Sequence, residues 1–345
     1  MYDTQRCATP QEVQRTSSVL VLSVDGKGVP RRKAALRAGT RRAAEAQPPP
    51  RCPRRKPGER AHTKRMATVA AVYTITPWIR TPEDIVRELQ PAHAVSPARP
   101  HPEAKRVWAS LVQPPAEVIG QAFEEAVRRD PQRTKQWVAL VDGNPTPLGL
   151  LYAAAAAYGI TLCIVLDLIH VLQYLWKAAR ALHPADAPEA ETWVPARLEQ
   201  LLRGRSQYVA AGMRRSATLR GLTEEQRAPV DQCAHSLLQY ADFLHYDAYL
   251  AAGFPIATGV IEGACRHLVK DRMEVTGARW SLNGAEAVLR LRSLWVSGDY
   301  EAYWRLHLEQ EQQRNHTTHY ADGKVPSQQP QPERQGKGAH LRLIT

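Results

Sequence analysis

Two aspartates follow apolar segments in the same sequence context, and a glutamate lies in the first turn of an apolar helix. Asp25 ends the run VLVLSVD, Asp142 ends the run WVALVD, and each is followed by glycine. A strand of this kind delivers its carboxylate to the carboxyl edge of a sheet, where ligand sites of open α/β sheets lie. Glu262 supplies the third carboxylate. Asp-Gly is also common turn chemistry, and an early helical Glu also complements the helix dipole, so each residue alone fits a structural role.

Carboxylates contributed by separate elements are suited to Mg²⁺, which prefers hard oxygen ligands and keeps several waters. Two such ions about 3.5–4 Å apart can activate a nucleophile and stabilise the leaving oxygen of a phosphodiester. The repeated Asp-Gly context in a basic chain favours this interpretation over two unrelated turns. We therefore expect Asp25, Asp142 and Glu262 to be catalytic residues that bind Mg²⁺, with Mn²⁺ as a substitute.

The positive charge of the chain is confined to one segment. The 345 residues carry a net charge of +12, and the segment from Lys27 to Arg65 accounts for all of it. A patch of this density binds polyanions by releasing counterions, and nucleic acid is the usual partner. A solvated arm without a specific target is the alternative. The residues of this segment expected to bind DNA are Arg31, Arg32, Lys33, Arg54, Arg55 and Lys56.

Further basic residues follow Glu262 on its predicted helix. Arg266 and Lys270 stand four and eight residues after Glu262, so α-helical spacing places them on its face, and Arg272 follows. These three residues are candidates for contacts with DNA phosphates, and a solvated basic face is an equal alternative. Trp280 suits stacking on a base, but packing in the core is favoured.

The apolar runs predict an α/β protein with a mixed sheet. Strands are expected over 19–24, 66–75, 137–141 and 160–166, and the basic stretch 27–65 is expected to form a loop or a long hairpin excursion. Helices are expected over 82–89, 118–129, 148–158, 168–182, 260–275, 283–296 and 299–312. Helical spacing also runs through 190–252, with breaks expected at Gly204, Gly212, Gly221 and Pro229, and Thr258 is a possible helix N-cap.

Several classes of protein are excluded by composition. The five cysteines lie far apart and form no C-x-x-C pair, so neither a zinc knuckle nor a disulfide framework is indicated, and a reducing cytosolic compartment is the simplest interpretation. Cys163 and Cys265 are expected to be small buried hydrophobic residues. No secretory signal opens the chain, and the longest apolar region is broken by Asp167 and His170, which argues against a membrane span.

A series of ordered motifs resembles a known family. The motifs are VDGKGVP (24–30), RMATVAAVYTI (65–75), LVDGN (140–144), LDLIHVLQYLW (166–176), PIATGVIEGACR (255–266) and GARW (277–280). Together they resemble bacterial insertion-sequence transposases of the Kra-type group, within the DDE superfamily. The resemblance covers about residues 19–320. It implies a ribonuclease-H-like fold and a two-metal enzyme, located with the nucleoid in the bacterial cytoplasm, that cleaves element ends and joins them to target DNA.

Carried over residue by residue, the resemblance makes Asp25, Asp142 and Glu262 the catalytic triad. Asp167 and His170 match a D-x-x-H signature on the next strand, and Asp167 is an alternative middle carboxylate. Asp142 is preferred because the strand count of the family places it beside the first strand. The resemblance also implies a homo-oligomer on DNA, with neither a membrane nor a small-molecule substrate.

The implied organisation has five parts. They are a short segment 1–18, a core 19–182, an all-α insertion 183–252 before the third carboxylate, the rest of the core 253–320, and a disordered tail 321–345. Such transposases usually carry a longer N-terminal region, so the chain is expected to be truncated or part of a split gene, and Thr258 stands where Ser is common. An inactive relic that only binds DNA and a stand-alone ribonuclease-H-like nuclease are the alternative functions.

Overall fold

The computed structural model describes residues 16–36, 38–46, 64–89, 99–183, 188–275 and 277–317. Three of the residues expected to bind DNA (Arg54, Arg55 and Lys56), the expected tail 321–345 and most of the expected segment 1–18 lie outside the described residues.

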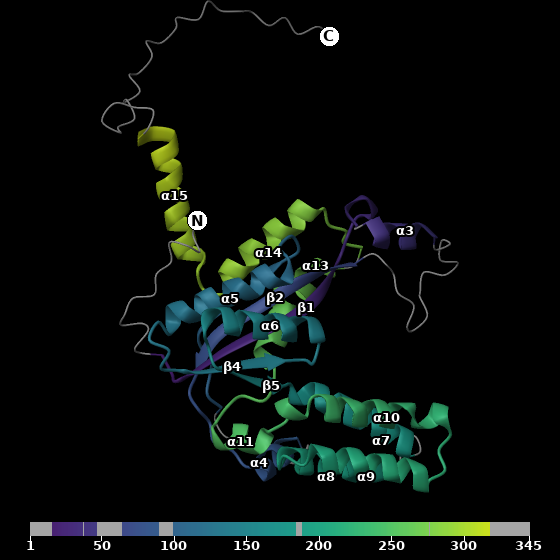
Figure 1. Ribbon diagram of the computed structural model, residues 1–345. Coiled ribbons are helices and arrows are strands. Elements are labelled where there is room, and N and C mark those ends of the chain that lie inside the picture. Colours follow the sequence, from purple (N-terminus) through teal and green to yellow (C-terminus); the bar gives the residue numbers. More distant parts are fainter. Residues whose placement is uncertain are drawn as a thin grey trace, which may run out of the picture.

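A five-stranded mixed sheet forms the centre of the molecule, in the order β3-β2-β1-β4-β5 (Figure 1). The central strand β1 (Val19–Pro30) pairs antiparallel with β2 (Lys64–Ile75), which pairs antiparallel with β3 (Glu103–Ser110). On its other side β1 is parallel to β4 (Gln136–Val141), which is parallel to β5 (Leu162–Leu166). The prediction of an α/β protein with a mixed sheet is therefore confirmed.

Strand β1 is longer than the sequence indicated. The expected strand over 19–24 was to end at Asp25-Gly26, but β1 continues to Pro30 and pairs with β2 throughout. The glycines here have a packing role: a Cβ at Gly28 would lie 2.9 Å from Lys64 Cδ, and one at Gly26 would lie 3.1 Å from Met66 Cε. The Asp-Gly pair of β1 is thus extended backbone packed against the side chains of Lys64 and Met66, and the predicted end of this strand was wrong.

The edge strand β3 was absent from the sequence prediction. Its sequence, EAKRVWAS, shows no regular alternation of apolar residues, and an exposed charged side chain such as that of Lys105 is typical of an edge strand. Side chains from helix α14 (Leu282–Val296) and from Ser297, which directly follows it, cover the free edge of β3. Ser297 Oγ contacts both the amide and the carbonyl of Val107, and Glu286 accepts a hydrogen bond from the Leu111 amide at 2.8 Å.

Most predicted helices are present, with small shifts of their ends. Six of them are α4 (Pro82–Glu88), α5 (Pro115–Arg129), α6 (Pro145–Tyr158), α7 (Leu168–Leu182), α14 (Leu282–Val296) and α15 (Tyr300–Gln312). Helix α3 (Ala38–Ala46) was not predicted and lies within the basic stretch expected to form a loop or a hairpin. Helix α15 projects away from the body of the molecule (Figure 1).

The segment between α7 and the Glu262 helix is helical wherever it is described. It contains α8 (Pro188–Leu202), α9 (Ser206–Leu219), α10 (Glu224–Gln239) and α11 (Tyr246–Ala251), which lie beyond the β5 side of the sheet (Figure 1). Breaks occur at Gly204 and Gly221 as predicted, where both glycines adopt positive φ. The predicted breaks at Gly212 and Pro229 were wrong, because both residues lie inside helices.

Two apolar cores hold these layers together. The larger joins β1, β4 and β5 to helices α5–α7 and to the helices of the insertion. The second lies on one face of β1, β2 and β3 and is covered by α14 and by a continuous helix that runs through α12 (Gly259–Ala264), the π-helical segment η3 (Cys265–Lys270) and α13 (Asp271–Met273). Within the described residues, no helix combines the length and apolar character needed to cross a membrane.

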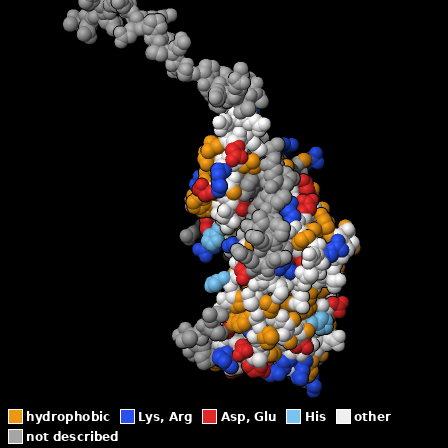
Figure 2. All heavy atoms as spheres, turned by 90° about the vertical axis from the view of Figure 1, so that its left-hand side faces the viewer, with side chains coloured by type: hydrophobic (Ala, Val, Ile, Leu, Met, Phe, Trp, Pro, Cys, Tyr) orange, Lys and Arg blue, Asp and Glu red, His pale blue; other side chains and the backbone are white. Residues whose placement is uncertain are grey.

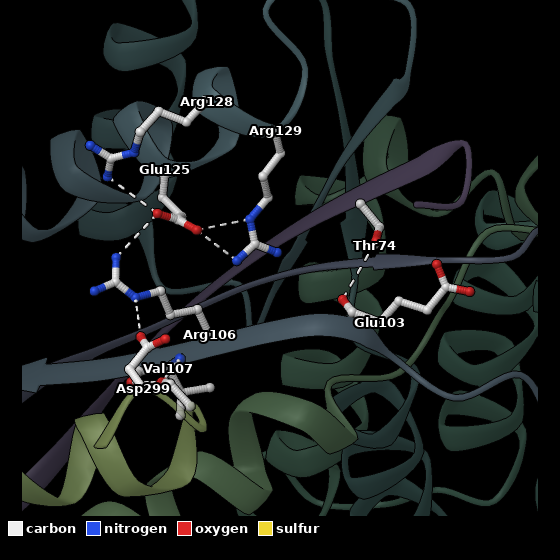
Figure 3. A network of polar contacts seen from close by, with 9 residues as sticks. Thr74, Glu103, Arg106, Val107, Glu125, Arg128, Arg129 and Asp299 are labelled. Atoms are coloured by element: carbon white, nitrogen blue, oxygen red, sulfur yellow. Dashed lines mark hydrogen bonds and ion pairs between the residues drawn. The ribbon is translucent and has the colours of Figure 1, made fainter. Parts of the chain in front are cut away.

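A network of buried charges joins β3 to α5 and to the start of α15 (Figure 3). Glu125 accepts hydrogen bonds from Arg106 at 3.1 Å and from Arg129 at 2.7 and 2.9 Å, and Arg128 adds a contact at 3.2 Å. Asp299 accepts from Arg106 Nε at 3.0 Å. These five residues form what we call the β3 network. In this network each carboxylate is paired with at least one arginine, and the pairs attach the edge strand β3 to α5 and to the start of α15.

Candidate functional site

Strand register places three aspartates at one level of the sheet. The parallel pairing of β1 with β4 ends at Ser23 opposite Leu140, and each partner is followed by Val and then Asp. The pairing of β4 with β5 ends at Val141 opposite Leu166, so Asp142 and Asp167 follow at the same level. Neighbouring strands lie about 4.8 Å apart, so Asp25, Asp142 and Asp167 form one row at the carboxyl ends of β4 and β5. We call this row the aspartate row.

The side chain of Asp25 lies on the sheet face that the Glu262 helix covers. Asp25 stands opposite Val69, which belongs to the second apolar core together with that helix. The Cys265 thiol donates a hydrogen bond to Asp25 Oδ2 at 3.2 Å, and the Gly26 amide donates to Oδ1 at 2.6 Å. Burial raises the pKa of Cys265, and the negative charge of Asp25 raises it further. Cys265 is buried as expected, but it also contacts a candidate catalytic carboxylate.

Asp142 lies just after the end of β4, where glycine allows a sharp turn. Gly143 has a φ of 86°, which is the left-handed region, and Asp142 Oδ1 accepts a hydrogen bond from the Asn144 amide at 2.9 Å. Tyr240, at the end of α10, donates to the Gly143 carbonyl at 2.5 Å. The half-buried Asp142 is therefore held between its own turn and the insertion.

Asp167 is fully buried and both of its oxygens are engaged. Oδ1 accepts a hydrogen bond from the Thr258 amide at 2.9 Å, and Oδ2 accepts from the His170 amide at 3.2 Å and lies 2.7 Å from His170 Nδ1. Asp167 thus caps helix α7 and ties it to the residue that precedes the Glu262 helix. Thr258 does occupy the N-cap position of α12, but its side chain makes no capping hydrogen bond.

Glu262 is exposed in the first turn of α12, as the sequence predicted. Its charge raises the pKa of Cys265, which touches Asp25, and also the pKa of His170. The hydrogen bond to Asp167 is the largest cause of the raised His170 pKa, and the charge of Asp142 contributes as well. The charge of Glu262 therefore acts on the partners of Asp25 and Asp167, at two positions of the aspartate row.

Sequence reasoning missed three tyrosines that fasten the insertion to the ends of the parallel strands. Besides Tyr240, Tyr246 donates to the Leu166 carbonyl at 2.8 Å and Tyr249 to the Ile164 carbonyl at 3.2 Å. Burial raises the pKa of Tyr246, so its hydroxyl remains a hydrogen-bond donor. The YDAY spacing gave no signal, because tyrosines at helical spacing are ordinary packing residues.

The candidate DNA-binding residues occupy two places. Arg266, Lys270 and Arg272 are exposed on the Glu262 helix, although the π-helical segment departs from the α-helical spacing used to place Lys270. Arg32 is exposed after β1, whereas Arg31 is buried, and the side chain of Lys33 is not described. Figure 2 shows one further face of the molecule, where positive and negative side chains are interspersed.

Trp280 packs against the second apolar core and donates from Nε1 to the Met273 carbonyl at 3.1 Å. Packing rather than base stacking is the role that the sequence favoured for it. The GARW segment is thereby joined both to the Glu262 helix and to the end of β1.

The carboxylates of the site suit a divalent cation in kind. Asp25, Asp142 and Glu262 supply hard oxygen donors, and two of them are half-buried beside each other in the sheet. In the described parts of the chain, no three His, Cys, Asp or Glu side chains are gathered in an arrangement that would hold a metal ion. The donor types of these three residues therefore fit Mg²⁺.

In comparisons with known proteins, no protein-family model, curated protein or solved structure matches the chain.

Proposed function

We propose that the protein is a DNA transposase of the DDE type with a ribonuclease-H-like core, which cleaves the ends of an insertion sequence and joins them to target DNA. One observation carries this proposal: Asp25 and Asp142 stand side by side at the same level of neighbouring parallel strands, on a sheet whose Asp25 face is covered by the Glu262 helix. The order of the strands and the motifs of the sequence agree with the same function.

The residues divide into ligands and positioning groups. Asp25 and Asp142 would hold Mg²⁺ between neighbouring strands, and Glu262 would complete the ligand set. Bound Mg²⁺ supplies charge stabilisation to a phosphodiester under attack and makes water or a 3′-hydroxyl a better nucleophile. Asp167 is inaccessible and its oxygens are hydrogen-bonded, so its role in the proposal is to fix the start of the Glu262 helix.

The partners in this proposal are DNA molecules. The exposed Arg266 and Lys270 lie on the same continuous helix as Glu262, where they would contact phosphates near the site. Two element ends and one target must meet for strand transfer, which calls for at least two copies of the chain on DNA.

The test is a strand-cleavage and strand-transfer assay with Mg²⁺ or Mn²⁺. Labelled duplexes of the DNA that flanks the coding sequence serve as donors and a supercoiled plasmid as target. Asp25→Asn, Asp142→Asn and Glu262→Gln are each expected to lower the rate at least 10³-fold, about 4 kcal/mol of transition-state stabilisation. Each is expected to leave the melting temperature near that of wild type, because these carboxylates are at most half-buried.

Glu225→Gln is the control, since Glu225 is an exposed carboxylate in the first turn of α10, outside the proposed site. Full cleavage by Asp142→Asn would refute the middle ligand proposed here and favour Asp167. Metal-dependent hydrolysis without joining would identify a stand-alone nuclease, and DNA binding without either reaction would identify a relic.

A further inference from the structure

Strand β1 continues past the end of its parallel pairing, and Lys27 lies on this overhanging part. The last residue of β1 that pairs with β4 is Ser23, whereas β1 itself runs to Pro30. Within the described residues, only β2 pairs with β1 beyond Ser23, so the other edge of the overhang has no strand partner. The residues from Asp25 to Gly28 are half-buried or exposed, so this part of β1 is accessible to a ligand.

Lys27 lies on the same face of the sheet as Asp25. Side chains alternate along a strand, so two residues that stand two positions apart point to one face. Their partners in β2, Val69 opposite Asp25 and Ala67 opposite Lys27, both belong to the second apolar core, which the Glu262 helix covers. Two residues of extended chain span about 7 Å. Lys27 therefore stands next to the aspartate row, on the face where Asp25 and the Glu262 helix meet.

The positive charge of Lys27 is not consumed by the fold. Burial is the main cause of the raised pKa of Cys265, the charges of Asp25 and Glu262 raise it further, and the charge of Lys27 opposes them. These three charges therefore surround the thiol that contacts Asp25. Within the described residues, the Lys27 ammonium nevertheless forms no ion pair or hydrogen bond, whereas Lys64 on the next strand is paired with Glu274. Lys27 thus keeps its donors available beside the candidate metal ligands.

We propose that Lys27 is a catalytic residue that binds a non-bridging oxygen of the phosphodiester cleaved at the aspartate row. This inference rests on the proposed function for the reaction. Water attacks the phosphorus, the bond to the 3′-oxygen breaks, and the proton of the water ends on that oxygen, so Lys27 keeps its own proton. A lysine carries three donors on a flexible stem and can follow the phosphate as its geometry changes. A cation already in place stabilises the charge that develops on the phosphate oxygens.

The test compares Lys27→Met and Lys27→Arg with wild type in the strand-cleavage assay, with the DNA concentration varied so that kcat and KM are separated. Lys27→Met is expected to lower kcat about 100-fold, as is usual when one group that stabilises transition-state charge is removed, and to change KM much less. Lys27→Arg keeps the charge and should retain about a tenth of the wild-type kcat or more. Lys105→Met is the matched control, because Lys105 is an exposed lysine without a described partner on β3 of the same sheet.

Thermal unfolding without DNA separates this role from a structural one. Lys27→Met is expected to melt at the wild-type temperature, because Lys27 is half-buried and its ammonium has no partner in the described chain. The inference is overturned if Lys27→Met cleaves at the wild-type rate, if it melts lower in proportion to its loss of activity, or if Lys27→Arg loses as much activity as Lys27→Met.

DNA binding distinguishes a failure of this inference from a failure of the proposed function. If the wild type cleaves no DNA, the proposed function fails, and binding of a labelled duplex in EDTA then decides the role of Lys27. Fluorescence anisotropy at a series of salt concentrations gives the slope of log K against log salt, to which each phosphate contact contributes about 0.9. Lys27→Met should reduce that slope by about 1 and Lys105→Met should not. An unchanged slope in Lys27→Met would then overturn the inference as well.

Discussion

The carboxylates of the β3 network and those of the aspartate row differ in their partners, although both groups lie beside the same sheet. In the β3 network, Glu125 is buried and accepts hydrogen bonds from Arg106, Arg128 and Arg129. At the aspartate row, Asp25 and Asp142 are half-buried, and the only hydrogen bonds to their carboxylates within the described residues come from Cys265 and from backbone amides next to or near them in sequence. No arginine or lysine in the described part of the chain forms an ion pair with either aspartate.

This difference separates charge that the fold itself satisfies from charge that it leaves without a cationic partner. A buried carboxylate with three arginines around it is satisfied by the fold itself, and losing it leaves those arginines uncompensated. Carboxylates without cationic partners on neighbouring strands repel one another, and a ligand of positive charge would relieve that repulsion. Asp167 belongs to the first kind although it stands in the aspartate row, because its partners are amides and a histidine of the chain itself.

The comparison is tested most directly by removing one negative charge from each region. Glu125→Gln is expected to lower the free energy of unfolding by about 3–5 kcal/mol, because it breaks a buried charge cluster. Glu262→Gln is expected to change it by less than about 0.5 kcal/mol, as is usual for exposed positions. Urea denaturation of the two variants and wild type, followed by circular dichroism, measures both values. Equal losses in the two variants would show that Glu262 is also a structural residue.

Asp167→Asn is expected to have an intermediate effect. The asparagine oxygen can still accept from the Thr258 amide, but the interaction with His170 is lost, so the free energy of unfolding should fall by about 1–3 kcal/mol. Strand cleavage should be reduced as well, because the Glu262 helix is held less firmly. Asp242→Asn, an exposed change in the insertion, is the control for stability. Wild-type stability combined with complete loss of cleavage would instead make Asp167 a metal ligand.

The sequence was sufficient to predict elements with a clear apolar pattern, and residues that follow such elements directly. Alternating or continuous apolar runs located β1, β2, β4 and β5, and the order of aspartates after these runs identified the row before their register was known. The end of β1 was mispredicted because Asp-Gly has two local uses: a turn, or extended backbone beneath a crossing side chain. Only the partner strand decides between them, and a single sequence does not show it.

The features that were missed depend on contacts between distant segments. Strand β3 has a weak apolar pattern because Ser297 and Glu286 of a later helix cover its edge. The hydrogen bonds of Cys265 with Asp25, of Thr258 with Asp167 and of Tyr246 with Leu166 each join residues at least 80 positions apart. Residue type alone suggested packing for the cysteine and gave no role to the tyrosine, because its partner is a backbone carbonyl.

A smaller loss of unfolding free energy is expected where an uncharged hydrogen bond joins the insertion to the strand that precedes Asp167. Tyr246→Phe removes the hydroxyl that donates to the Leu166 carbonyl, one residue before Asp167, and leaves a buried acceptor unsatisfied. The expected loss of unfolding free energy is about 1–2 kcal/mol, since no charge is involved. Tyr208→Phe makes the same chemical change at a side chain that is 69% exposed and should have no measurable effect. If both variants were equally stable, neutral hydrogen bonds would not fasten the insertion here, and the position of Asp167 would depend on its contacts with Thr258 and His170 alone.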